Sequence, residues 1–226
     1  MPLAVVSLSG GLDSCVTAAC ARAMGFDLAL LHADYGQRTQ AREHRAFTDI
    51  GDFYGVGPRL VVDFNGLKQI GGSALTDPGI PLPAGDLERQ GVPVSYVPFR
   101  NAHLLASCVS WAEVLGAEAI FVGFVEEDSS GYPDCREAFL RAFETAANLG
   151  TRPETRLAFH APLLHLRKSA IVKLGRELGA PVHLSWSCYQ SEEEACGVCD
   201  SCLLRLRGFR EAGDADPIPY AAALRS

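Results

Sequence analysis

Strand-length apolar runs alternate with helix-like segments along most of the chain, and this alternation limits the fold more than any other feature. Continuous apolar runs of this length are typical of strands buried on both faces of a sheet. Alternating strands and helices form βαβ units, so the sequence predicts a mostly parallel, Rossmann-like α/β sheet with helices on both faces. The expected strands are 3–8, 28–33, 59–64, 119–124 and 157–160, and the expected helices are 15–24, 40–54, 101–115, 135–149 and 168–178.

Changes of composition predict the organisation of the chain. We expect residues 1–184 to form the α/β domain, with a Gly-, Pro- and Asp-rich surface excursion at about 65–96. Residues 185–226 are expected to form a small cysteine-rich segment followed by a C-terminal helix and tail.

Charge and hydropathy restrict the partners. The 226 residues carry a net charge of −7, which disfavours a long nucleic acid because such partners usually bind a basic face. No apolar run is long enough to span a bilayer, and the N-terminus has no basic segment typical of a secretory signal. We therefore expect a cytoplasmic protein with small-molecule partners, no direct nucleic acid and no membrane, and we expect a homodimer that uses the excursion or the tail.

The segment SGGLDS, Ser9 to Ser14, connects the first expected strand to the first expected helix. Adjacent glycines permit close approach of a ligand to the backbone, and a helix N-terminus attracts anions. The glycines are not followed by the Gly-Lys-Ser/Thr of a Walker A loop. The pattern favours a phosphate site at the carboxyl end of the sheet, and the alternative is a glycine-rich turn with Asp13 as a helix cap.

Four of the eight cysteines lie within fifteen residues near the end of the chain, with the spacing Cys-x7-Cys-x2-Cys-x2-Cys. The predicted metal ligands are Cys188, Cys196, Cys199 and Cys202. Four thiolates without an open position indicate one structural Zn²⁺ per chain, and an iron–sulfur cluster is the alternative. Cys15, Cys20 and Cys108 are expected to be small buried residues of helices, and Cys135 is a weak nucleophile candidate.

SGGLDS resembles the PP-loop of the adenine-nucleotide α-hydrolases, also called N-type ATP pyrophosphatases. That resemblance implies ATP as co-substrate, with Mg²⁺, and cleavage between the α- and β-phosphates. The second βα loop, DYGQR, is then expected beside the adenosine. The expected ATP-binding residues are Leu8, Ser9, Gly10, Gly11, Leu12, Asp13, Ser14, Cys15, Val16, Thr17, Ala18, His32, Asp34, Tyr35, Gln37, Arg100 and Asn101.

Polar residues also gather in two later loops and at the start of a late helix. Carboxylates after the fourth strand suit the N–H donors of a purine-like base, and an aromatic ring can stack on it. The expected substrate-binding residues are Glu126, Asp128, Ser129, Tyr132, Asp134 and Arg136, and the expected catalytic residues are Asp13, Ser14 and Lys168. The alternatives are a solvated loop, Asn101 as a simple helix cap and Lys168 as an exposed first-turn lysine.

The strings SGGLDS, DYGQR, SALT, VPFRN, SGYPDCREAF, LGT, WSCY and CGVCDSCLLRLRGF together resemble the 7-cyano-7-deazaguanine synthases. The resemblance implies that 7-carboxy-7-deazaguanine, ammonia and ATP give the 7-cyano product through adenylated carboxylate and amide intermediates. Many members have glycine where this chain has Phe99, and we expect that ring to narrow the space beside Arg100. Three rival classes share parts of the pattern: sulfur-inserting tRNA enzymes, amide-forming ligases and zinc-ribbon binding modules.

Overall fold

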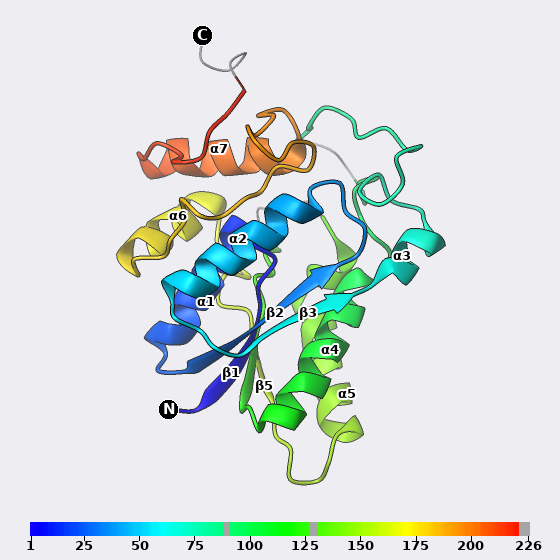
Figure 1. Ribbon diagram of the computed structural model, residues 1–226, viewed down its shortest axis with the longest axis vertical. Coiled ribbons are helices and arrows are strands. Elements are labelled where there is room, and N and C mark those ends of the chain that lie inside the picture. Colours follow the sequence, from blue (N-terminus) through cyan, green and yellow to red (C-terminus); the bar gives the residue numbers. More distant parts are fainter. Residues whose placement is uncertain (88–90, 127–130, 222–226) are drawn as a thin grey trace.

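The computed structural model describes residues 1–87, 91–126 and 131–221. Its centre is a five-stranded sheet in which every neighbouring pair is parallel (Figure 1). The strand order is β3-β2-β1-β4-β5. The strands are β1 (Leu3–Ser7), β2 (Asp27–Asp34), β3 (Arg59–Asp63), β4 (Ala119–Phe121) and β5 (Ala158–His160). The expected parallel α/β fold is thus confirmed.

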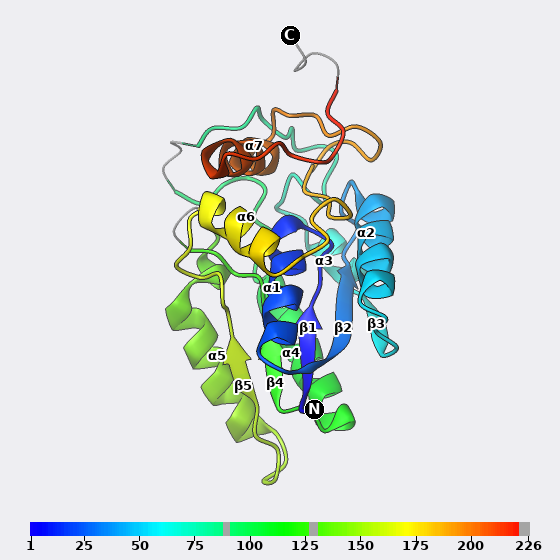
Figure 2. The ribbon, with the colours of Figure 1, turned by 90° about the vertical axis from the view of Figure 1, so that its left-hand side faces the viewer.

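Helices cover both faces of this sheet, and the C-terminal helix with neighbouring loops lies beyond the carboxyl ends of the strands (Figure 2). One buried cluster joins the first face to α1, α2 and α6, and a second joins the other face to α4 and α5. A seventh helix packs on α6, away from the sheet. The helices are α1 (Leu12–Ala23), α2 (Gln40–Phe53), α3 (Asn65–Ile70), α4 (Arg100–Leu115), α5 (Glu137–Gly150), α6 (Lys168–Glu177) and α7 (Asp200–Ala212).

The strand order places a switch point between β1 and β4. The chain leaves β1 toward β2 on one side, and it returns to the other side of β1 only with β4. In open α/β sheets, ligands bind outside the carboxyl ends of the strands at such a point. The segment SGGLDS follows β1 directly and therefore lies there.

The boundaries differ from the expected ones where tertiary contacts decide them. β4 ends at Phe121 rather than residue 124, at the residue where its pairing with both β1 and β5 ends. The excursion begins with the short helix α3, which the sequence pattern did not show. No helix of the described residues is long and apolar enough to cross a membrane.

Phe99 precedes α4 in a left-handed backbone conformation, with φ of 57°. Its side chain is 57% exposed and its ring meets Phe139 edge-on at 5.9 Å. The ring therefore points away from the cavity described below, so the expectation that it narrows the space beside Arg100 is wrong. This backbone suits the glycine that the resemblance implies for this position, because left-handed conformations cost other residues about 1–2 kcal/mol.

We expect Phe99→Gly to be more stable than Phe99→Ala by about 1 kcal/mol, although alanine usually stabilises a helix more than glycine does. Both variants lack the ring, so the comparison isolates the cost of a Cβ at positive φ. Urea unfolding of the two variants measures the difference. An alanine variant as stable as the glycine variant would show that this backbone carries no strain.

Candidate active site

A cavity of about 250 Å³ opens where the strands β1, β2 and β4 end. The loop after β1, the start of α4 and the start of α6 each contribute to its wall. The C-terminal segment forms a further part of the wall, through residues before and within α7. Segments far apart in the sequence thus enclose one space at the switch point of the sheet.

The loop SGGLDS is fixed by hydrogen bonds within it and by the packing of α2. Ser14 Oγ donates to Gly11 O at 3.1 Å, and the hydroxyls of Ser9 and Ser14 lie 3.1 Å apart. Gly10 has φ of 88°, and a Cβ there would lie 2.7 Å from the carbonyl oxygen of Glu43. The loop therefore requires glycine at this position, and the first-turn N–H groups of α1 follow it as an anion site.

Asp13 does not cap α1, because Gly11 occupies the N-cap position and no side chain bonds there. Its carboxylate instead accepts two hydrogen bonds from Lys168 Nζ, at 2.8 and 2.9 Å. Lys168 opens α6 and is only 6% exposed, so it is not an exposed first-turn lysine. A partly buried ion pair thus lies beside the phosphate-binding loop, and both residues line the cavity.

Gly123 lets the end of β4 approach the loop closely. A Cβ at this position would lie 2.9 Å from Ser14 N and 3.0 Å from the carbonyl carbon of Asp13. Both neighbours are backbone atoms at the start of α1, which have little freedom to move. The close approach holds the loop at the switch point.

We expect Gly123→Ala to lower kcat/KM by at least about 10-fold, because the added methyl group displaces the first turn of α1. The free energy of unfolding should fall by about 1–3 kcal/mol, as for other overpacked sites. Gly57→Ala is the control, since a Cβ there meets nothing within 4 Å. Equal kinetics and stability for the two variants would contradict this account of Gly123.

Arg100 and Asn101 lie at the start of α4 and line the cavity. Arg100 Nη1 donates to the Tyr35 hydroxyl at 2.8 Å. Asn101 Nδ2 donates to Asp134 Oδ1 at 3.1 Å, and Asp134 Oδ2 accepts from the backbone N–H of Asn101 at 3.0 Å. Asp134 thus holds Asn101 in place, and Asn101 is not the N-cap, which is Phe99.

Most residues of the second βα loop lie behind the cavity wall and do not line the cavity. His32 is 1% exposed, and burial lowers its pKa, so its neutral ring donates from Nδ1 to Leu8 O at 3.0 Å. Gln37 accepts from Tyr35 N at 2.9 Å. Of the residues expected here as a wall, Tyr35 lines the cavity, whereas His32, Asp34 and Gln37 lie behind it.

The structure brings part of the expected site together around this cavity. Lining residues are Ser9, Gly11, Leu12, Asp13, Ser14, Tyr35, Arg100, Asn101, Tyr132 and Lys168. Described residues that do not line it are Leu8, Gly10, Cys15, Val16, Thr17, Ala18, His32, Asp34, Gln37, Glu126, Asp134 and Arg136. Leu8, Cys15, Val16 and Ala18 belong to the buried core instead. Asp128 and Ser129 lie outside the described residues.

Cys135 also lines the cavity, beside Asn101. Burial raises the pKa of its thiol to about 12. The thiol is therefore protonated at neutral pH, and a protonated thiol is a poor nucleophile. This environment argues against a sulfur-carrying role for Cys135.

Several lining residues were not found by sequence reasoning. They are Ser7, Leu31, Ala33, Glu43, Leu75, Leu104, Gly123, Phe124, Val125, Trp186, Ser187, Tyr189, Ser201, Leu204 and Arg205. Arg205 is 1% exposed and makes two hydrogen bonds to Asp216, at 2.7 and 3.0 Å. Its one signal in the sequence is an arginine between leucines, LLRLR. An arginine among apolar residues does not by itself predict that the arginine is buried. That prediction also requires its acidic partner, which is Asp216 here.

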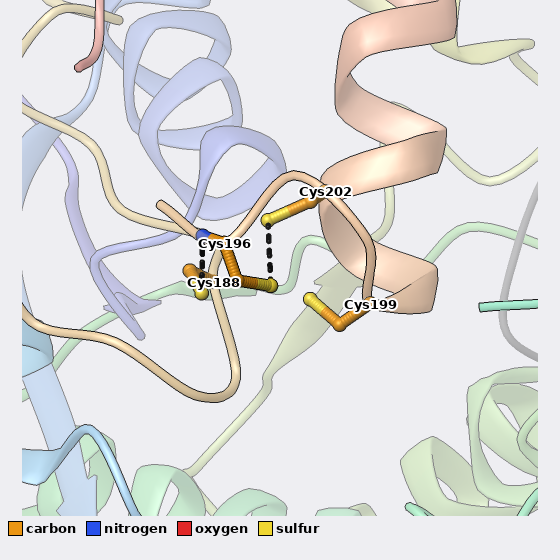
Figure 3. A group of neighbouring side chains, drawn as sticks. All are labelled: Cys188, Cys196, Cys199 and Cys202. Carbon is orange, nitrogen blue, oxygen red and sulfur yellow. Dashed lines mark hydrogen bonds between the residues drawn. The ribbon is translucent and has the colours of Figure 1, made fainter. Parts of the chain in front are cut away.

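The four cysteines of the C-terminal segment converge (Figure 3). Their sulfur atoms all lie within 4.8 Å of one another, and Cys196 Sγ lies 3.9 Å from Cys202 Sγ. Cys188 Sγ accepts from the N–H of Cys196 at 3.3 Å, as sulfur ligands of metals commonly do. A bridge between Ala195 and Tyr220 attaches the tail to this loop. The donor set fits a single soft metal ion.

The comparisons with known proteins place this site in a family. The family model "Queuosine biosynthesis protein QueC" matches residues 3–213. A 7-cyano-7-deazaguanine synthase from Chlorobium phaeobacteroides (strain DSM 266 / SMG 266 / 2430) is 58% identical over 96% of both chains. One from Chlorobium chlorochromatii (strain CaD3) is 54% identical over 96% of this chain and 95% of that protein.

Solved structures agree in fold. A 4-thiouridine synthetase–RNA complex with bound ATP has a TM-score of 0.53 and 20% identity, and it covers 99% of this chain and 49% of its own. A predicted subunit of tRNA methyltransferase from Methanocaldococcus jannaschii has a TM-score of 0.50 and 11% identity, covering 98% and 93%. At these identities the likeness concerns the fold alone. The match over nearly the whole sequence decides the family: the chain belongs to the queuosine biosynthesis protein QueC family.

Proposed function

We propose that this enzyme uses ATP and ammonia to convert 7-carboxy-7-deazaguanine to 7-cyano-7-deazaguanine. The relatives that match over 96% of the chain are named for that product. The observation that carries the proposal is a single cavity with an anion-binding loop on one wall and Arg100 and Tyr132 on another. The loop suits the phosphates of a nucleotide, and the cation of Arg100 suits a carboxylate.

Adenylation solves the chemical problem of this reaction. A carboxylate is a poor electrophile because its oxygens are poor leaving groups, and transfer of AMP to one oxygen makes that oxygen leave readily. The loop N–H groups and the Ser9 and Ser14 hydroxyls bind the departing pyrophosphate. Lys168 offsets the charge that develops there. Asp13 would hold Mg²⁺, which supplies further charge neutralisation on the phosphates.

Arg100 serves the other side of the cavity. Its hydrogen-bond partners among the described residues are the neutral Tyr35 hydroxyl and the Asn101 amide. Among these residues no carboxylate lies within ion-pair distance of it, so its charge is available to an anion. We assign Arg100 to the α-phosphate and to the substrate carboxylate that attacks it. Such a cation aligns the two reacting groups and reduces their repulsion.

Tyr132 is placed to stack on the deazaguanine ring. Its hydroxyl donates to Ser95 Oγ at 3.0 Å, and its ring lies 5.7 Å from that of Tyr96. These contacts fix the ring at the wall of the cavity. Asp134 acts through Asn101, which it orients. Direct contacts of Glu126, Asp128, Ser129 and Arg136 with the substrate remain predictions from the sequence.

The metal of the cysteine cluster is proposed to be one structural Zn²⁺. Zn–S bonds of about 2.3 Å place the sulfurs of a regular tetrahedron about 3.8 Å apart. The sulfur separations, all within 4.8 Å, are close to that value. A four-iron cluster binds its cysteines through different irons and so requires wider spacing. The ion would fix the segment that carries Trp186 and Arg205 into the cavity wall.

Product analysis tests the proposed reaction. The purified protein is incubated with ATP, Mg²⁺, ammonium and 7-carboxy-7-deazaguanine, and the products are identified by mass spectrometry. The proposal predicts nitrile, AMP and pyrophosphate, and no nitrile when ammonium is omitted. The amide as sole end product would identify an amide-forming ligase instead. An unchanged carboxylate with folded, metal-loaded protein would refute the substrate assignment.

The sequence also predicts a cytoplasmic homodimer that binds no nucleic acid directly. The acidic net charge of −7 supports the last of these predictions. Sedimentation equilibrium measures the oligomeric state. Binding of tRNA that weakens as the salt concentration rises would contradict the prediction on nucleic acid.

A further inference from the structure

Glu43 brings a carboxyl group to the same cavity from the first turn of α2. Oε1 accepts a hydrogen bond from Thr39 Oγ1 at 2.7 Å, and Oε2 accepts one from Gln37 Nε2 at 3.2 Å. Gln37 is itself fixed, because its Oε1 accepts from Tyr35 N. The carboxyl group is therefore held in one position and has lone pairs left to face the cavity.

Glu43 also lies close to the adenylating loop. Its carbonyl oxygen is the atom that a Cβ on Gly10 would approach to 2.7 Å, so this turn of α2 packs directly on the loop. Among the described residues no lysine or arginine forms an ion pair with Glu43. The role assigned above to the loop and to Lys168 leaves this carboxyl group unused.

The surroundings of Glu43 tune its proton affinity. Burial raises its pKa from an ordinary value near 4.5 to about 7, while the Thr39 and Gln37 hydrogen bonds and the charge of Arg100 act in the opposite direction. Asp34, at the end of β2, adds to the increase. Near neutral pH the group exists in both protonation states, as a general acid–base catalyst requires.

We propose that Glu43 is the general base that takes a proton from nitrogen in both halves of the reaction, an inference that rests on the proposed function. In the first half, ammonia forms the C–N bond, the C–O bond to AMP breaks with its electron pair, and one N–H proton passes to the Glu43 carboxylate. The products are amide, AMP and protonated Glu43. Glu43 returns this proton to solvent before the second half.

In the second half, the amide oxygen attacks the α-phosphate of a second ATP, pyrophosphate leaves, and the carbon becomes doubly bonded to NH₂⁺. Glu43 takes one of the two protons on this nitrogen and returns it to solvent, which leaves the carbon doubly bonded to N–H. Glu43 takes that N–H proton, the electron pair forms the third C–N bond, and AMP leaves with the C–O pair. The products are nitrile, AMP and protonated Glu43. One fixed base serves both steps because the substrate carbon and nitrogen stay at one place in the cavity.

The variant Glu43→Gln distinguishes a catalytic base from a residue with a purely structural role. With its amide turned, Gln accepts from Gln37 Nε2 and donates to Thr39 Oγ1, so both hydrogen bonds of the side chain survive. The change removes only the ability to take a proton. Glu177→Gln is the matched control, because it makes the same change at an exposed position of α6.

Two partial reactions give the decisive comparison. Exchange of labelled pyrophosphate into ATP with 7-carboxy-7-deazaguanine, without ammonium, reports adenylation. Single-turnover formation of amide and nitrile with ammonium reports the nitrogen steps. We expect Glu43→Gln to keep the exchange within about 3-fold of wild type and to lose amide and nitrile formation by about 10²- to 10⁴-fold, whereas Glu177→Gln changes neither.

Other outcomes overturn the proposal. Nitrile formation at the wild-type rate by Glu43→Gln would show that this carboxylate is not the base. Loss of the exchange together with the nitrogen steps would show that it positions ATP or substrate instead. If the wild-type protein itself shows neither exchange nor nitrile, the proposed function fails, and that result is visible before any variant is made.

Two pH measurements test the proton affinity of Glu43, and the first of them gives a result that a purely structural role would not produce. At a constant concentration of free ammonia, the wild-type rate of amide formation should rise with pH through about 7, and Glu43→Gln should lack that rise. Because folding raises the pKa, the native state binds more protons between about 4.5 and 7, so wild-type stability falls across that window as pH rises. The Tm of Glu43→Gln relative to wild type should therefore rise over this range, and a constant difference would contradict the raised pKa of Glu43.

Discussion

Replacing Lys168 with methionine should lower kcat/KM for nitrile formation by about 10²- to 10³-fold, the usual effect of removing one group that stabilises transition-state charge. Lys168 Nζ lies 2.8 Å from Asp13 and lines the cavity beside the phosphate-binding loop. Methionine keeps the apolar stem that packs against Gly208 of α7. The effect should therefore fall on the chemistry more than on the packing, although Asp13 loses its partner and stability decreases as well.

Lys173→Met is the matched control, since it lies on the same helix with an exposed side chain. Steady-state kinetics at a temperature where both variants are folded give the comparison. Wild-type kcat/KM for a folded Lys168→Met protein would show that the ion pair is only structural. It would also remove Lys168 from the account of pyrophosphate departure.

Replacing Cys202 with serine should release the metal and lower the free energy of unfolding by on the order of 5 kcal/mol. A structural zinc ion contributes much of the folding free energy of the segment that binds it. Cys202 is buried at the start of α7, and the other three sulfurs converge on it (Figure 3). Activity should be lost too, because Trp186 and Arg205 of the same segment line the cavity.

Metal analysis and thermal unfolding measure this prediction. The wild type should contain one zinc per chain, and Cys202→Ser should contain much less. Val198→Ala in the same loop is the control, since Val198 is exposed and offers no ligand. About four irons per chain in anaerobically purified protein would show that the cysteines hold an iron–sulfur cluster and not zinc. A fully active, metal-free Cys202→Ser protein would refute a structural metal.

The sheet and the phosphate loop were predictable because their signals are local. The segments LAVVS and LALLHA have strand length and are mostly apolar, and SGGLDS begins two residues after the first of them. Helix α2 was expected at residues 40–54 and lies at Gln40–Phe53. Spacing within a short segment likewise predicted the four converging cysteines.

The remaining parts of the site depend on contacts between distant residues. Arg205 lines the cavity because Asp216 and Ser185 pair with it, and no local pattern predicts those partners. In the sequence, Glu43 is one of several charged residues in a polar helix. Its place in the cavity wall follows only from the packing of α2 on the phosphate-binding loop. The left-handed backbone at Phe99 could not be predicted either, because phenylalanine rarely adopts a positive φ and its presence does not indicate one.

The central claim is that one cavity activates the same substrate carbon twice, and an isotope measurement tests it most directly. The substrate 7-carboxy-7-deazaguanine is prepared with ¹⁸O in both carboxylate oxygens and incubated with the enzyme, ATP, Mg²⁺ and ammonium. The account predicts two AMP molecules for each nitrile, and each AMP carries one ¹⁸O. Label found in phosphate or ADP, or a nitrile formed with only one labelled AMP, would contradict it.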